Sequence, residues 1–243
     1  MSTALKSLNV DTRRYRTGVF LEKNLLSASF LARSPLSDMV SESFGKKLLT
    51  YRKNEFLFHE NEPATGVYLI ISGKVKIVKH ENKPAQTILY LVKPGDILGI
   101  HAIVNGHNYT NTAVAMVNTH VCFIPGKEFL RLIKNNNDYK FVIMQLLCTR
   151  IDLIENQISS RYEKDATERF AELLVFLTNT YGLSDKKVLK IELTMEDLAN
   201  LTGTSKGYLS KIIGEFSQKD IIVFKGRSIK ILSKKELEKI ANI

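Results

Sequence analysis

One change of pattern, near Pro125, limits the folds open to this chain more than any other feature of its 243 residues. Before Pro125, short apolar runs alternate with turn residues at spacings of about 8 to 12 residues, which is typical of an antiparallel sandwich or roll. After Pro125 the apolar residues recur at helical spacing. We therefore expect an α+β chain whose antiparallel β-roll begins near Leu48. The expected strands are Phe56–Phe58, Val67–Ile71, Lys74–Val78, Thr87–Val92, Thr112–Val117 and Val121–Ile124.

Turn residues separate these runs and set the limits of the expected strands. The turns are expected at Asn61–Pro63, Ser72–Gly73, Asn82–Pro84, Lys93–Asp96 and Asn105–Gly106. Residues 1–16 are polar and basic without clear periodicity, so we expect a loose arm there, with short helices between it and Gly45.

A long helix should follow the roll, because the segment from Asp138 to Ser160 has neither Gly nor Pro. Its apolar residues are spaced alternately three and four positions apart, as in the a/d seam of a coiled coil. The seam residues are Met144, Leu147, Ile151, Ile154 and Ile158. A core helix on its own domain is the alternative, but a narrow apolar stripe with polar flanks favours a two-stranded coiled coil. We therefore expect a homodimer.

A second amphipathic helix, Asp165–Thr180, should open a C-terminal domain, with Gly182 as its terminator. Its expected buried residues are Phe170, Leu173, Leu174 and Leu177. The expected domains are an arm and β-roll sensor over residues 1–136, a dimerisation helix over 137–160, and a third domain over 161–243.

The charge of the chain favours a polyanionic partner, because 35 Lys and Arg stand against 25 Asp and Glu, for a net charge of +10. Residues 204–235 alone carry eight cations and two anions, a net +6. No stretch approaches the roughly 18 apolar residues of a membrane span, and the N-terminus lacks the apolar core of a signal peptide. Nucleic acid in the cytoplasm, rather than a membrane, is therefore the expected partner.

The segment 193–213 explains that charge best. Thr194 is an expected N-cap with Asp197 three residues later, a variant of the capping box. Leu198, Ala199 and Leu201 should form the buried side of this first helix. Gly203 should turn the chain and Ser205 should cap a second helix, and two short helices joined in this way make a helix-turn-helix.

The second helix should dock through Leu209, Ile212, Ile213 and Phe216 and leave its other side free to read DNA. A β-hairpin should follow, with strands Ile221–Phe224 and Ile229–Leu232, and its basic turn would contact the sugar-phosphate backbone as a wing. Tyr208 packing inward is the alternative for that residue. The expected DNA-contacting residues are Thr204, Ser205, Lys206, Tyr208, Ser210, Lys211, Lys225 and Arg227.

Two further motifs carry a resemblance. The segment Leu57–Val75 resembles the early strands, and Gly95–Gly99 the Gly-acid-apolar-apolar-Gly turn, of the family of the cyclic AMP receptor protein and the fumarate and nitrate reduction regulator (Crp/Fnr). The order of β-roll, long helix and winged helix-turn-helix is similar to that family over nearly the whole chain. The resemblance implies a dimeric bacterial transcription regulator with a cyclic-nucleotide-binding-like sensor domain. It also implies an inverted-repeat DNA target and RNA polymerase as a further partner.

The resemblance places an effector pocket at Gly95, Asp96, Leu98, Gly99, Asn111, Thr112 and Ala113. In the family's cyclic-nucleotide binders a carboxylate in the turn holds the ribose, and an Arg before the Ser/Thr-Ala pair neutralises the phosphate. Asp96 keeps the first role, but Asn111 stands where the Arg would be. Because a buried phosphate without a charge-assisted partner is costly, we expect an effector other than cyclic AMP. The sequence does not identify that effector.

The recognition helix departs from the family as well. Lys206 and Lys211 correspond to the arginines of the family's Arg-Glu-x-x-x-Arg motif, and Gly207 stands where Glu would accept a hydrogen bond from cytosine. The DNA sequence read should therefore differ from that of the cyclic AMP receptor protein.

Cofactor chemistry stays open. An iron-sulfur sensor needs four cysteines, whereas this chain has two, Cys122 and Cys148. Because their spacing does not suit metal ligands, both are expected to be small core residues in a reducing compartment. His101 or His107 near the pocket would suit an axial haem ligand, although surface histidines are the commoner case. A haem-based gas sensor and a cyclic-nucleotide-binding regulatory subunit remain the alternatives. No metal site is expected, and no catalytic motif suggests an enzyme.

Overall fold

The computed structural model describes residues 35–79 and 87–243. The chain divides into two compact units, with the boundary between Thr149 and Arg150. The expected arm of residues 1–16 and the expected turn at Asn82–Pro84 lie outside the described residues.

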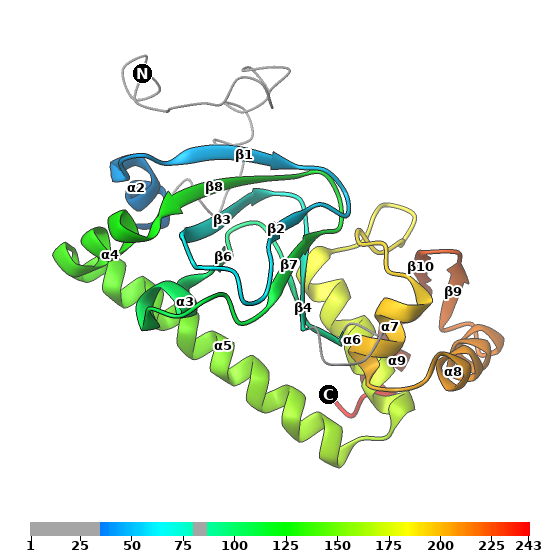
Figure 1. The fold of residues 1–243 in the computed structure, drawn as a ribbon. Helices are drawn as coiled ribbons and strands as arrows, with labels where there is room; N and C mark the ends of the chain where they lie inside the picture. Colours follow the sequence, from blue (N-terminus) through cyan, green and yellow to red (C-terminus); the bar gives the residue numbers. More distant parts are fainter. Residues whose placement is uncertain (1–34, 80–86) are drawn as a thin grey trace. The chain divides into compact units, whose positions relative to one another are not determined.

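The first unit contains two four-stranded sheets in which every paired strand is antiparallel (Figure 1). One sheet has the order β1-β8-β3-β6, with β1 at Lys47–Tyr51, β8 at Thr119–Pro125, β3 at Gly66–Ser72 and β6 at Ile97–Leu98. The other has the order β2-β7-β4-β5, with β2 at Phe56–Phe58, β7 at Thr112–Ala115, β4 at Val75–Lys79 and β5 at Thr87–Val92. The predicted β-roll is confirmed.

Strand β3 is buried on both faces, which explains its unbroken apolar run. Its residues Tyr68 and Ile70 join the core between the two sheets, together with Ile77 of β4 and Val121 of β8. Val67, Leu69 and Ile71 face the other way and pack with residues of four helices. Those helices are α2 (Pro35–Glu42), α3 (Ile100–Asn105), α4 (Gly126–Asn135) and α5 (Asn137–Glu163). The sheet containing β3 therefore forms the middle layer of the unit.

Several details of the first unit differ from the sequence-based expectation. Strands β1 and β6 were not predicted: β1 precedes the first expected strand, and β6 has two residues and lies within what reads as a turn. Strand β7 ends at Ala115 rather than at Val117, because the chain bends there and the Met116 N–H donates to the Lys74 carbonyl at 2.8 Å. The expectation that Cys148 is a core residue is wrong: Cys122 is buried, but Cys148 is exposed on α5.

The second unit contains a helical core and one hairpin. Its elements after α5 are α6 (Ala166–Tyr181), α7 (Met195–Thr202), α8 (Lys206–Gln218), β9 (Ile222–Lys225), β10 (Ser228–Ile231) and α9 (Lys234–Ile240). The rings of Phe170 and Phe216 pack with centroids 5.7 Å apart, joining α6 to α8. Leu173 and Leu201, which were expected to be buried, are half-buried, and Thr202 occupies the interior in place of Leu201. Helix α9, which packs on α6, was not predicted.

The described part of the chain has no helix that is both long and apolar enough to cross a membrane. Within the same residues, no group of three or more His, Cys, Asp or Glu side chains is placed to hold a metal ion.

Candidate functional site

Helix α7 begins at the predicted cap. The Asp197 N–H donates to Thr194 Oγ1 at 3.0 Å, and the Thr194 N–H donates to Asp197 Oδ2 at 3.0 Å, which completes a capping box. Both bonds satisfy donors that a helix start leaves without intrahelical partners. The position of α7 is therefore fixed by a local signal in the sequence.

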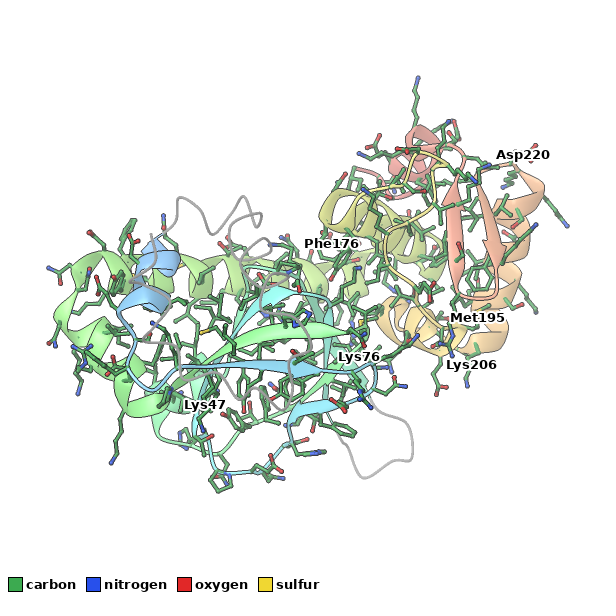
Figure 2. The ribbon with its side chains drawn as sticks, turned by 90° about the horizontal axis from the view of Figure 1, so that it is seen from above. Lys47, Lys76, Phe176, Met195, Lys206 and Asp220 are labelled. Carbon is green, nitrogen blue, oxygen red and sulfur yellow. The ribbon has the colours of Figure 1, made fainter. Side chains whose placement is uncertain are left out.

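The turn into α8 also follows the sequence. Gly203 has φ +70°, a left-handed conformation that favours glycine at a helix C-terminus. The Thr204 N–H donates to the Ala199 carbonyl at 3.0 Å, and Ser205 Oγ accepts from the Tyr208 N–H at 3.2 Å as the cap of α8. Met195 and Lys206, the first residues of α7 and α8, are labelled in Figure 2.

Helix α8 has two unlike faces. Leu209, Ile212, Ile213 and Phe216 are buried, as expected. On the other face Ser205, Lys206, Tyr208, Ser210 and Lys211 are exposed, whereas Thr204 at the turn is half-buried. Tyr208 is 50% exposed, so the alternative in which it packs inward is wrong. Lys206 Nζ lies 3.2 Å from Glu196 Oε2, but both side chains are mostly exposed, so this pair contributes little to stability and leaves Lys206 available.

The wing forms next to this face. Strands β9 and β10 pair in a register that places Lys225 opposite Ser228, with Gly226 and Arg227 as the turn. Gly226 has φ +62°, as a two-residue hairpin turn requires at its first central position. Lys225 and Arg227 are exposed at the tip. The Leu193 N–H donates to the Arg227 carbonyl at 3.3 Å, which ties the tip to the segment before α7.

The exposed cations of residues 204–235 extend beyond α8 and the wing. All eight are exposed: Lys206, Lys211, Lys219, Lys225, Arg227, Lys230, Lys234 and Lys235. Exposed ammonium and guanidinium groups are accessible to phosphates, and binding them releases counterions from the DNA.

In the turn Gly95–Gly99 of the expected effector pocket, the Asp96 carboxylate bonds to a neighbouring residue of the same loop. Asp96 Oδ2 accepts from the Lys93 N–H at 2.9 Å, and Asp96 Oδ1 lies 3.6 Å from Lys93 Nζ. Gly99 has φ +85°, and a Cβ there would lie 2.9 Å from the Gly66 carbonyl oxygen. The turn thus needs glycine at Gly99, and the Asp96 carboxylate is engaged within the turn itself.

Tyr109 packs against the glycine turn of the expected pocket. Its hydroxyl donates to the Gly66 carbonyl at 2.7 Å, and its ring would be 3.1 Å from a Cβ at Gly99. The ring stacks on Phe58 with centroids 4.1 Å apart. Burial raises the pKa of the neighbouring Tyr68 far above its usual value. This aromatic cluster is an interior element that the sequence-based site missed.

A cation that the sequence did not suggest lies beside Asn111. Lys79 Nζ donates to the Thr110 carbonyl at 3.0 Å and pairs with Glu60 Oε1 at 2.9 Å. Thr112, which is fully buried, accepts from the Glu60 N–H at 2.9 Å. Lys79 is thus held by a carboxylate from its own chain.

The histidines proposed as haem ligands and the expected seam are all at the surface. His101 and His107 are exposed, which fits surface histidines and gives no support to an axial ligand. Along α5, Tyr139 and Ile143 are buried, but the seam residues keep between 42% and 53% of their surface exposed. A core helix would have buried them, so the exposure contradicts that alternative.

The comparisons with known proteins agree with this architecture. Residues 48–136 match the cyclic nucleotide-binding domain family, and residues 168–240 match the Crp-like helix-turn-helix domain family. The chain belongs to the Crp/Fnr family. It is accordingly a transcription regulator with a DNA-binding helix-turn-helix, and not an enzyme.

Known members of the family match this chain over most of their own length. The CRP-like cAMP-activated global transcriptional regulator of Mycobacterium tuberculosis is 24% identical over 193 residues, which cover 79% of this chain and 86% of that protein. The fumarate and nitrate reduction regulatory protein of Vibrio cholerae is 27% identical over 195 residues, covering 79% and 77%. The structure of FixK2 from Bradyrhizobium japonicum has a TM-score of 0.71 at 20% identity, covering 80% and 96%, and shares the fold.

The sequence of this Crp/Fnr protein does not predict a role for three residues that the structure shows in long-range contacts. Lys79, Tyr109 and Arg169 each contact segments that lie far away along the chain. No local pattern signals such a contact, because the partners are backbone carbonyls whose position depends on the folded structure.

Proposed function

We propose that this Crp/Fnr regulator binds double-stranded DNA as a homodimer at an inverted repeat. The observation that carries the proposal is the outward face of α8, where Lys206, Tyr208 and Lys211 are exposed while the opposite face is anchored in the core. A recognition helix needs this combination, because its side chains must reach base edges from a rigid support.

The contacts divide by their place on this surface. Lys211, one turn into α8, is the candidate for a guanine contact, and Lys206 is expected nearer the DNA backbone. Arg227 and Lys225 on the wing grip phosphates. The small side chains at the start of α8, among them Thr204, Ser205 and Ser210, allow close approach to the DNA. Gly207 is exposed with nothing within 4 Å of a Cβ, so the helix surface is flat at that point.

Dimerisation proceeds through α5. The seam of Met144, Leu147, Ile151, Ile154 and Ile158 is apolar and exposed on a helix of 27 residues, and a second copy of the same helix would cover it. The proposed domains follow: the N-terminal arm and β-roll sensor over 1–136, the dimer helix over 137–160 and the DNA-binding domain over 161–243. α5 itself continues to Glu163.

The β-roll responds to an effector other than cyclic AMP. Asn111 offers no charge, and the Asp96 carboxylate is engaged with Lys93. Lys79, whose ammonium bonds to the Thr110 carbonyl, is already paired with Glu60, so a phosphate binding there would compete with a carboxylate of the protein. As a regulator of transcription it acts in the cytoplasm, with RNA polymerase as a further partner.

Selection of bound duplexes from a random pool tests the proposal. The enriched sequences should be inverted repeats whose half-site centres lie about 34 Å apart, one helical turn. Enrichment of single sites without symmetry would contradict the dimeric mode of reading, and no enrichment at all would contradict specific binding.

A further inference from the structure

One side chain of α6 reaches the backbone of two other segments. Arg169 Nε donates to the Thr202 carbonyl at 2.9 Å, and Nη2 donates to the Gly203 carbonyl at 3.4 Å. Its third nitrogen, Nη1, donates to the Lys164 carbonyl at 2.6 Å. All of these residues belong to the second unit.

The accepting carbonyls stand at the ends of helices. Thr202 is the last residue of α7 and Gly203 its left-handed cap. Lys164 directly follows α5, and its N–H donates to the Ser160 carbonyl at 3.1 Å. The last carbonyls of a helix lack intrahelical partners and carry partial negative charge, so a cation stabilises them. The planar guanidinium has donors in a fixed fork and can hold both helix ends at once, which a lysine ammonium does less well.

A carboxylate on the same helix strengthens one side of this connection. Glu172 accepts hydrogen bonds from the Ser160 hydroxyl and, at 2.7 Å, from Lys164 Nζ. The end of α5 is therefore bound to α6 by both Arg169 and Glu172. Arg169 goes further, since it also holds the turn at Gly203, three residues before α8 starts at Lys206.

We propose that Arg169 is a positioning residue for DNA recognition. It fixes the turn at Thr202–Gly203, and with it the start of α8, relative to the end of the dimer helix. In a dimer this connection sets the separation of the two recognition helices. The inference rests on the proposed binding of an inverted repeat. Loosening the connection would leave each helix-turn-helix able to bind its half-site but would remove the preference for one half-site spacing.

The test compares two variants with a matched control. Arg169→Lys keeps the positive charge but loses the planar set of guanidinium donors, and Arg169→Met removes both the charge and the donors. Lys186→Met removes an exposed charge from a turn of the same unit. Binding is measured on the inverted repeat, on the same half-sites moved apart by a few base pairs, and on a single half-site. For both Arg169 variants we expect about tenfold weaker binding to the inverted repeat, with single half-site binding within about twofold of the unaltered protein. The preference for the natural spacing should fall accordingly, and Lys186→Met should retain it.

A change of spacing preference distinguishes positioning from a purely structural cap, which would weaken binding to every duplex alike. Equal losses on all duplexes, or an unaltered spacing preference, would overturn the role of Arg169. If the unaltered protein itself prefers no spacing, the proposed function fails and the inference with it.

Hydrogen exchange gives a readout that needs no DNA. In Arg169→Met the amides of Lys164 and Thr204 should both exchange faster, because the two helix ends lose one common partner. Faster exchange at Thr204 alone would make Arg169 a cap of α7 and would overturn the connection to α5.

Discussion

The seam of α5 gives the sharpest test of assembly, through Ile151→Asp. The five seam residues keep between 42% and 53% of their surface exposed in a single chain. Covering that half is worth about 1 kcal/mol per residue, since full burial of Ile or Leu contributes about 1.5 to 3 kcal/mol. Two chains together thus contribute on the order of 10 kcal/mol, and association costs about 4 to 15 kcal/mol. The surplus that holds the two chains together is thus at most about 6 kcal/mol.

Ile151→Asp would place one carboxylate from each chain at the middle of this seam. Each buried ion costs several kcal/mol, so two exceed the surplus. Sedimentation equilibrium should therefore show a monomer. Leu153→Asp is the matched control, because Leu153 is also exposed on α5 but lies off the seam, and this variant should stay dimeric. A dimeric Ile151→Asp protein, or dissociation of both variants alike, would refute the assignment of the seam.

Three further expectations concern the effector, the cap of α7 and the thiols. Calorimetry should detect no cyclic AMP binding up to about 100 μM, because the missing charge-assisted contact at Asn111 is worth on the order of 1.5 to 3 kcal/mol; micromolar affinity would contradict this. Thr194→Ala should lower the free energy of unfolding by about 1 kcal/mol in thermal or urea denaturation, while Ser217→Ala on exposed α8 surface should not; equal stabilities would count against the capping box. A thiol reagent should modify Cys148 in the native protein but reach Cys122 only after unfolding, because burial raises the pKa of the Cys122 thiol to about 12; rapid loss of both thiols would contradict the assignment.

The parts of this structure that the sequence predicts are those encoded by local signals. Thr194 and Asp197 specify the start of α7 because their side chains bond to backbone groups within one turn. Likewise an unbroken apolar run predicts β3, which is buried on both faces, and apolar residues separated by lysines predict β4. Short elements such as β6 and α3 carry too few residues for a period to be recognised.

The remaining features depend on contacts between distant segments. Cys148 looks like a core residue because apolar residues surround it in sequence, but it is exposed on α5, as are its neighbours Leu147 and Ile151. The sequence likewise does not show that the Asp96 carboxylate accepts a hydrogen bond from the Lys93 N–H. Lys79 beside Thr110 and Arg169 beside Thr202 are invisible in sequence for the same reason, since their partners are backbone carbonyls on other elements.

The central claim is that α8 reads bases while the wing contacts the DNA backbone. DNA binding by the Lys211→Ala and Arg227→Ala variants tests it most directly. Both variants are measured on the selected inverted repeat and on a scrambled duplex at several salt concentrations, with Lys219→Ala, at the far end of α8, as a control. Lys211→Ala should lose about 1 to 3 kcal/mol on the inverted repeat and little on the scrambled duplex. Arg227→Ala should weaken binding to both duplexes alike and reduce the salt dependence. Equal losses on both duplexes for Lys211→Ala would reassign that residue to phosphate, and the absence of any loss in either variant would contradict DNA binding by this surface.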